Sequence, residues 1–241
     1  MNAIFSPEGK QFQVQYAQTA VDNSETILGV KCKDGIIVGC EKQRISKLLS
    51  QKTSKRIYNI NEHIGAAIGG LLPDGRLVVD RAIYENQNYT DTFAIPITGE
   101  ILADRVGQYV HNYTQYSGYR PLGQSLIIAS YNEYDGYKLH MVESSGLTLG
   151  YHACTAGKGK QTAKAELEKR DFKTMTVKEA LPYVLKTLNL THEEFKDKEY
   201  EFEVSWICGE SQNKHQLVPE QLRTEAEKRA LEMIEEDEMA D

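Results

Sequence analysis

The chain has 241 residues, of which 40% are hydrophobic and 26% charged, and its formal net charge is -7 at pH 7. This length allows one large domain or two small ones, with the composition of an ordinary globular protein. The negative charge argues against a non-specific nucleic-acid binder, because neutralising phosphate requires clustered lysine and arginine. No apolar run is long enough to span a bilayer and no secretory signal opens the chain, so we expect neither nucleic acid nor membrane as a partner.

The N-terminal segment, residues 1–23, combines a tight turn with apolar side chains. Pro7 and Gly9 are turn formers, Phe5 precedes them, and a short helix is expected to begin after Val14. The segment offers no pattern typical of a nucleophile, a metal site or a phosphate cradle. We therefore predict a docking element.

Seven apolar runs next to turn residues predict β-strands, several of them in antiparallel hairpins. One hairpin turns at Asp34-Gly35 and another at Asp135-Gly136. The continuous apolar character of the hairpin strands implies burial on both faces. In chain order the predicted strands are residues 27–32, 36–40, 64–68, 126–131, 137–142, 200–207 and 215–218.

Helices are expected between these strands. Residues 74–92 and the apolar stripe from Leu102 to Tyr113 form a pair after the first strands. A capping box at residues 176–179 starts a later helix, which Pro182 should bend. A last helix follows, with Pro219 suited to its first turn.

The final ten residues, 232–241, form an acidic tail that is rich in carboxylates and has no compensating base. We expect this tail to be frayed and solvated. The alternative is an electrostatic contact site for a basic partner.

Two antiparallel sheets packed face to face, each covered by helices, fit this order of elements. We therefore predict an α+β fold, a four-layer αββα sandwich. No change in composition marks a linker, so residues 1–241 are expected to form one domain. The same architecture occurs in hydrolases whose nucleophile is an N-terminal Thr, Ser or Cys.

Short catalytic and ligand-binding motifs are weak in this chain. The run Gly157-Lys158-Gly159-Lys160 lacks the glycine spacing and the hydroxyl of a Walker phosphate loop, since Gln161 follows it. The six histidines are scattered and the four cysteines are widely spaced. We therefore expect no metal site, cofactor or disulfide framework, and interpret the cysteines as buried thiols.

An N-terminal-nucleophile hydrolase is the main alternative that would have activity of its own. Its free α-amino group would act as the base, which requires cleavage near Ser24 to Thr26. In the uncleaved chain Thr26 has an amide nitrogen instead, so the base is missing. We therefore expect no intrinsic peptidase activity.

Long, ordered runs of this chain resemble those of proteasome α-type subunits. The run from Phe5 to Ala17 is similar to the family's opening F-S-P-x-G segment, except that Gln15 replaces the usual glutamate. Within the family the chain looks closest to the eukaryotic alpha-seven (alpha type 3) class. Further matching runs lie at residues 32–35, 69–71, 74–76, 103–106, 113–123, 135–136, 145–146 and 156–158.

The resemblance implies a non-catalytic scaffold and gate subunit of the proteasome core particle, without a cofactor. The implied partners are neighbouring α subunits, β-ring subunits, the regulatory particle or other activators, and unfolded polypeptides in transit during ubiquitin-dependent degradation. It also implies a location in cytoplasm and nucleus. The lysine and aspartate that assist catalysis in β subunits would fall at Arg56 and Glu41, and an arginine does not readily exchange its proton.

The resemblance also implies contact positions. Arg56 would lie where a lysine of the family meets the carboxylate of an activator tail, and a plain surface arginine is the alternative. Only Met1 to Ile4 precede Phe5, where the family has a longer gating tail, so the share of this chain in the gate stays open. Ring contacts are expected at Phe5, Pro7, Gly9, Val14, Tyr16, Tyr116, Arg120 and Pro121.

Overall fold

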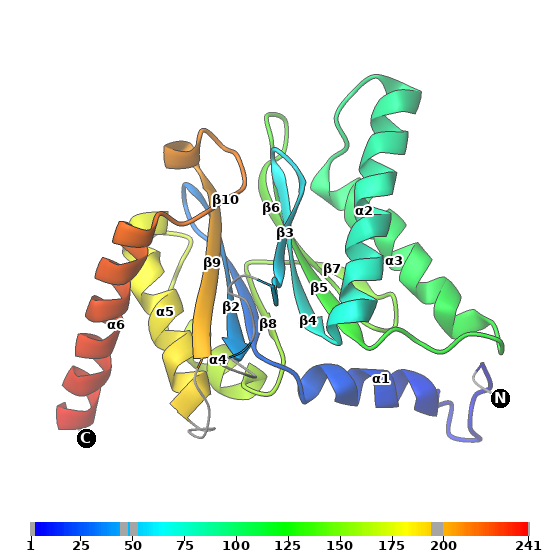
Figure 1. The fold of residues 1–241 in the computed structure, drawn as a ribbon, viewed down its shortest axis with the longest axis horizontal. Helices are drawn as coiled ribbons and strands as arrows, with labels where there is room; N and C mark the ends of the chain where they lie inside the picture. Colours follow the sequence, from blue (N-terminus) through cyan, green and yellow to red (C-terminus); the bar gives the residue numbers. More distant parts are fainter. Residues whose placement is uncertain (1–2, 44–47, 49–52, 194–199, 241) are drawn as a thin grey trace.

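The computed structural model describes residues 3–43, 48, 53–193 and 200–240. Within these residues the chain forms two five-stranded sheets that pack face to face, with helices on both outer faces (Figure 1). Neighbouring strands in both sheets are antiparallel. The predicted α+β four-layer sandwich is therefore confirmed.

The first sheet has the strand order β10-β9-β2-β1-β8. Its β1–β2 hairpin closes at the predicted Asp-Gly turn, where the backbone N–H of Cys32 donates to the carbonyl of Gly35 at 2.8 Å. The strands are β1 (Ile27–Lys31), β2 (Gly35–Gln43), β8 (Ala153–Ala156), β9 (Tyr200–Cys208) and β10 (Gln216–Leu217).

The second sheet has the order β3-β4-β5-β6-β7. Its β5–β6 hairpin turns at the second predicted Asp-Gly, where Gly136 has a φ of 67°, a conformation that favours glycine. The strands are β3 (Ile57–Asn61), β4 (Ile64–Gly70), β5 (Gln124–Asn132), β6 (Gly136–Val142) and β7 (Thr148–Tyr151).

The helices divide between the two outer faces. In Figure 1, α5 and α6 cover the first sheet, α2 and α3 cover the second, and α1 lies beneath the lower end of the second sheet, where it contacts β4 and β5. A 3₁₀ turn, η1 (Gly209–Ser211), follows β9. The helices are α1 (Phe12–Asp22), α2 (Leu72–Phe93), α3 (Gly99–Gln115), α4 (Lys160–Glu168), α5 (Val177–Glu193) and α6 (Glu220–Ala240).

Three apolar clusters lie between the four layers, because successive side chains of a strand point to opposite faces of its sheet. On β1, Ile27 belongs to the cluster between the two sheets, whereas Leu28 packs under α5. On β5, Ile127 lies between the sheets and Ile128 under α2 and α3. The strands are therefore buried on both faces, as their continuous apolar runs predict.

The helix-start signals are largely confirmed. At the start of α5 the Thr176 N–H donates to Glu179 Oε2 at 2.8 Å, and the Glu179 N–H to Thr176 Oγ1 at 3.4 Å, which is the predicted capping box. Pro219 lies just before α6 rather than inside its first turn, and its carbonyl accepts from the Arg223 N–H at 3.0 Å. Similarly, α1 begins at Phe12 rather than after Val14.

The expected frayed tail is wrong for the described residues, because α6 continues to Ala240. Met233 and Ile234 are buried on its inner face, and Asp237 forms an ion pair with the buried Lys186 of α5. On the outer face Arg229 pairs with two glutamates at positions 232 and 236. The acidic residues thus lie on an amphipathic helix whose apolar side packs against the fold.

Candidate functional site

Thr26 occupies the position that a terminal nucleophile would need, directly before β1. Its side chain is fully buried, and its nitrogen is part of the peptide bond to Glu25. The hydroxyl Oγ1 accepts a hydrogen bond from the backbone N–H of Gly159 at 3.1 Å. Thr26 therefore has neither a free α-amine nor access to a substrate, both of which a terminal nucleophile requires.

The glycine-rich loop after β8 holds this segment in place. The Lys158 N–H donates to the carbonyl of Ser24 at 2.9 Å, and Lys160 Nζ donates to Asp22 Oδ1 at 2.8 Å. Gly157 has a φ of 105°, and a Cβ there would lie 2.5 Å from the carbonyl oxygen of Glu25. The loop that resembles a phosphate cradle directs these donors at residues 22–26 of its own chain.

Arg56 lies beside the same segment and is buried, so the alternative of a plain surface arginine is wrong. Its Nη1 donates to the carbonyls of Ile68 at 3.1 Å and Gly70 at 3.3 Å, and its Nη2 forms an ion pair with Glu25. Its backbone N–H donates to Glu203 Oε2 at 3.1 Å. The guanidinium thus ties the segment before Thr26 to β4.

Glu41 on β2, where the resemblance would place an aspartate that assists catalysis in β subunits, makes contacts that hold the fold together. Its side chain is 1% exposed, and Oε1 lies 2.9 Å from His192 Nδ1 and 3.6 Å from Lys158 Nζ. Its backbone N–H donates to the carbonyl of Thr26 at 2.8 Å. The carboxylate connects β2 to α5 and to the glycine-rich loop. Among the described residues, neither it nor Arg56 hydrogen-bonds the Thr26 hydroxyl.

The N-terminal segment presents apolar side chains to solvent. Phe5, Pro7 and Gly9 are exposed around a turn that the Gly9 N–H closes on the carbonyl of Ser6 at 2.8 Å. On α1, the rings of Phe12 and Tyr16 stack with 6.4 Å between their centroids, and both are about half exposed. Exposed aromatic groups on a helix that follows an exposed turn suit a contact surface. Val14, also a predicted contact, is only partly buried.

The corner after α3 is held by an ion pair that the sequence motifs alone did not reveal. Arg120 binds Asp74 at the start of α2 through two contacts, Nη1–Oδ2 at 2.6 Å and Nη2–Oδ1 at 2.8 Å. The Gly123 N–H also donates to Asp74 at 2.9 Å, and these hydrogen bonds lower the pKa of the Asp74 carboxyl. Tyr116 is exposed here, whereas Pro121 is buried and contributes no side chain to the surface.

The predicted contact residues belong to two elements at one end of the sandwich. Figure 1 shows α1 and the C-terminal end of α3 at this end, close to the N-terminus. A Cβ at Gly123 would lie 3.5 Å from the Cβ of Ala20 on α1, so the corner after α3 touches the helix. The exposed aromatic residues of the two elements thus lie on the same end of the molecule.

Within the described part of the chain, no group of three or more His, Cys, Asp or Glu side chains could hold a metal ion. No described helix is both long and apolar enough to cross a membrane. The four cysteines are free and buried, and burial raises the pKa of Cys32 and Cys154 to about 12, which keeps both thiols protonated.

Comparison with known proteins gives one consistent family. A family model described as "Proteasome subunit" matches residues 21–207. The chain is 45% identical over 232 residues to the "Proteasome subunit alpha type-3" of Spinacia oleracea, covering 96% of this chain and 93% of the relative. It is 43% identical to the protein of that name in Dictyostelium discoideum, covering 97% and 94%. It is 41% identical to the "Probable proteasome subunit alpha type-7" of Schizosaccharomyces pombe, covering 94% and 89%.

Proposed function

This chain belongs to the proteasome subunit family, and from this premise we propose that it is a non-catalytic α-type subunit of the proteasome core particle. In this role it forms part of the α ring and assembles with other proteasome subunits. The two relatives of highest identity above carry the name alpha type-3, which supports the alpha-seven class within the family.

The observation that carries the proposal is the state of Thr26. Catalysis by a terminal threonine needs a free amine as base and an accessible hydroxyl as nucleophile. Here the nitrogen is an amide, the hydroxyl is buried, and Gly159 donates to it. The chain therefore contributes structure to a threonine-type protease complex, and other subunits contribute the catalysis.

Assembly into a ring needs two unlike surfaces on each subunit, because head-to-tail contacts join different faces. The N-terminal segment with Phe12 and Tyr16 of α1 forms one exposed aromatic surface. A second lies on α2 and the loop after it, where Leu77, Tyr84, Phe93 and Ile95 are 40–54% exposed. We assign both surfaces to contacts with other proteasome subunits.

Activator docking at Arg56 would require guanidinium donors that an activator carboxylate can reach. The guanidinium already binds Glu25 and two backbone carbonyls. An activator carboxylate would therefore have to compete with Glu25 for Nη2, or use the donors that remain. The proposed partners also include the regulatory particle or another activator, and unfolded polypeptides in transit. The proposed location is the cytoplasm and nucleus.

The proposal is tested by isolating the assembly that contains this chain. The chain is tagged at its C-terminus in its own cells, purified without crosslinking, and analysed for native mass and peptidase activity. We expect a very large complex, with peptidase activity that a threonine-directed inhibitor abolishes. A small species without other proteasome subunits would overturn the proposal.

A further inference from the structure

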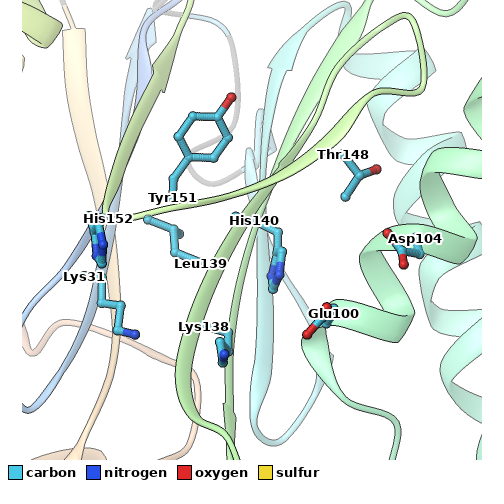
Figure 2. A pocket seen from close by; sticks show the side chains of 10 residues that line it. Lys31, Glu100, Asp104, Lys138, Leu139, His140, Thr148, Tyr151 and His152 are labelled. Carbon is cyan, nitrogen blue, oxygen red and sulfur yellow. The ribbon is translucent and has the colours of Figure 1, made fainter.

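A pocket of about 380 Å³ lies on the side of the sandwich, away from the Thr26 segment. Its walls come from the first turns of α3, from β6 and β7, and from the end of β1. Two acidic side chains, two lysines and two histidines are among those that line it (Figure 2): Glu100, Asp104, Lys31, Lys138, His140 and His152.

The charges of the pocket are separated by sign. Glu100 and Asp104 are one turn apart on α3, and Figure 2 shows them on one side of His140. Lys31 and Lys138 lie on its other side. The site is therefore bipolar, with an acidic wall and a basic wall.

None of these charged side chains has a hydrogen bond or ion pair with another described residue. Glu100 and Asp104 are exposed and Lys31 and Lys138 half-buried, so all four charges are open to a partner from outside the chain. The lysine pair is also unfavourable in the isolated chain, because burial and the neighbouring Lys138 lower the pKa of Lys31. An acidic group placed between the two lysines would relieve this repulsion.

His140 lies at the centre of the pocket and is only 8% exposed. Its Nδ1 is buried and has no hydrogen-bond partner in the described structure. Burial lowers the pKa of His140, so the ring is neutral at pH 7, with one nitrogen that donates and one that accepts a hydrogen bond. A buried polar atom without a partner is costly, so His140 brings an unsatisfied polar group to the wall of the pocket.

We propose that this pocket receives a mixed-charge segment of a neighbouring proteasome subunit. Lys31 and Lys138 bind its acidic side chain, and Glu100 and Asp104 bind its basic side chain. His140 forms a hydrogen bond with the same segment. The inference rests on the proposed function, which supplies neighbouring subunits as partners.

The chemistry favours a protein segment with both charges over a single ion. An anion would be attracted by the two lysines but repelled by the two carboxylates. A cation would be attracted by the carboxylates but repelled by the lysines. A segment with one side chain of each sign satisfies both walls, and such complementarity specifies the partner and its orientation more than it adds affinity. The pocket thereby determines which subunit can sit beside this one.

Carbodiimide crosslinking of the assembled particle tests the contact directly, since the reagent joins only carboxylates and amines already in contact. We expect coupled peptides that join Lys31 or Lys138 to a carboxylate of another subunit, and Glu100 or Asp104 to a lysine of another subunit. Coupling confined to this chain, or acetylation of Lys138 in the particle to the extent seen for Lys178, would overturn the proposal. Lys178 is exposed and pairs with Glu210 of its own chain.

Charge reversal gives an independent readout. We expect Lys138→Glu to lower the fraction of the chain found in the particle by several-fold, and Lys178→Glu to leave that fraction unchanged. A Lys138→Gln variant separates lost attraction from misfolding, because it removes the charge and preserves the size of the side chain. If the wild-type chain is found in the particle and Lys138→Glu is incorporated equally well, the pocket does not bind a neighbouring subunit. The proposed function would remain intact in that case. A wild-type chain absent from any large particle contradicts the proposed function itself.

Discussion

The backbone N–H of Gly159 donates to the hydroxyl of Thr26 at 3.1 Å, across 133 residues of sequence. This contact joins the glycine-rich loop to the residue that would be the nucleophile of a related hydrolase. A second contact, from the Lys158 N–H to the carbonyl of Ser24, fixes the chain just ahead of it. The segment leading into β1 is therefore held as an internal part of the fold.

Glycine at position 159 is required by close packing in this region. A Cβ there would lie 2.5 Å from the Cβ of Thr191 and 2.7 Å from Thr26 Oγ1. We expect Gly159→Ala to lower the free energy of unfolding by about 1–3 kcal/mol, measured by denaturant titration of the isolated chain. The control is Gly209→Ala, where an added Cβ would meet no atom within 4 Å. Equal stability of the two variants would contradict this packing.

The ion pair between Asp74 and Arg120 should give the chain a specific pH dependence. Hydrogen bonds from Arg120 and Gly123 lower the pKa of Asp74 in the folded state. Its stabilisation is therefore present above the unfolded pKa of about 3.9, and is lost as the pH falls through the folded pKa. Because Arg120 is 59% exposed, we expect Asp74→Asn to cost only about 1 kcal/mol at pH 6.

The difference in stability between wild type and Asp74→Asn should shrink as the pH is lowered below about 3.9. Chemical denaturation at a series of pH values measures it. Asp91→Asn is the matched control, because Asp91 is an exposed residue on the same helix. A gap that stays constant down to pH 3 would show that the Asp74 charge does not stabilise the fold.

The end of α6 is expected to contribute to stability through its apolar face. Ile234 is 7% exposed, whereas Leu231 in the same helix is 47% exposed. Ile234→Ala should lower the free energy of unfolding by about 2 kcal/mol, since it leaves a cavity. Leu231→Ala should change it by no more than about 0.5 kcal/mol. If both substitutions have the same small effect, the helix end is not packed against α5.

The aromatic surface of α1 is expected to act in assembly rather than in folding. Tyr16 is 59% exposed, so Tyr16→Ala should leave the melting temperature of the isolated chain nearly unchanged. In cells that express the tagged variant, we expect a several-fold smaller share of the chain in the large particle. Tyr134→Ala, at a 93% exposed position on the turn after β5, serves as the control. Normal incorporation of the Tyr16 variant would remove this residue from the interface.

Much of the fold could be predicted from the sequence because its signals are local. Apolar runs beside Asp-Gly turns located both hairpins, and the capping box located the start of α5. The end of α6 differs from the expected solvated tail because dense negative charge favours exposure, whereas Met233, an apolar position that helical spacing already indicates, and Ile234 are buried in the fold.

The contacts of the candidate site were less accessible to prediction, because they depend on long-range geometry. Arg56 is buried because it contacts Glu25, Ile68 and Gly70. The sequence alone does not show that these residues lie together. The role of the Gly157–Lys160 loop likewise depends on its distance from Thr26 in the fold. The bipolar pocket joins residues of β1, α3 and β6, and no local pattern marks it.

The central claim, a structural subunit without a terminal nucleophile, is tested most directly on this chain within the purified particle. Intact-mass measurement determines whether the residues before Thr26 are retained, and a threonine-directed activity probe reports whether the chain is labelled. We predict a chain that retains residues 1–25, apart from processing of the initiator methionine, and carries no probe, while other subunits of the same particle are labelled. A chain that begins at residue 24, 25 or 26 and carries the probe would contradict the account.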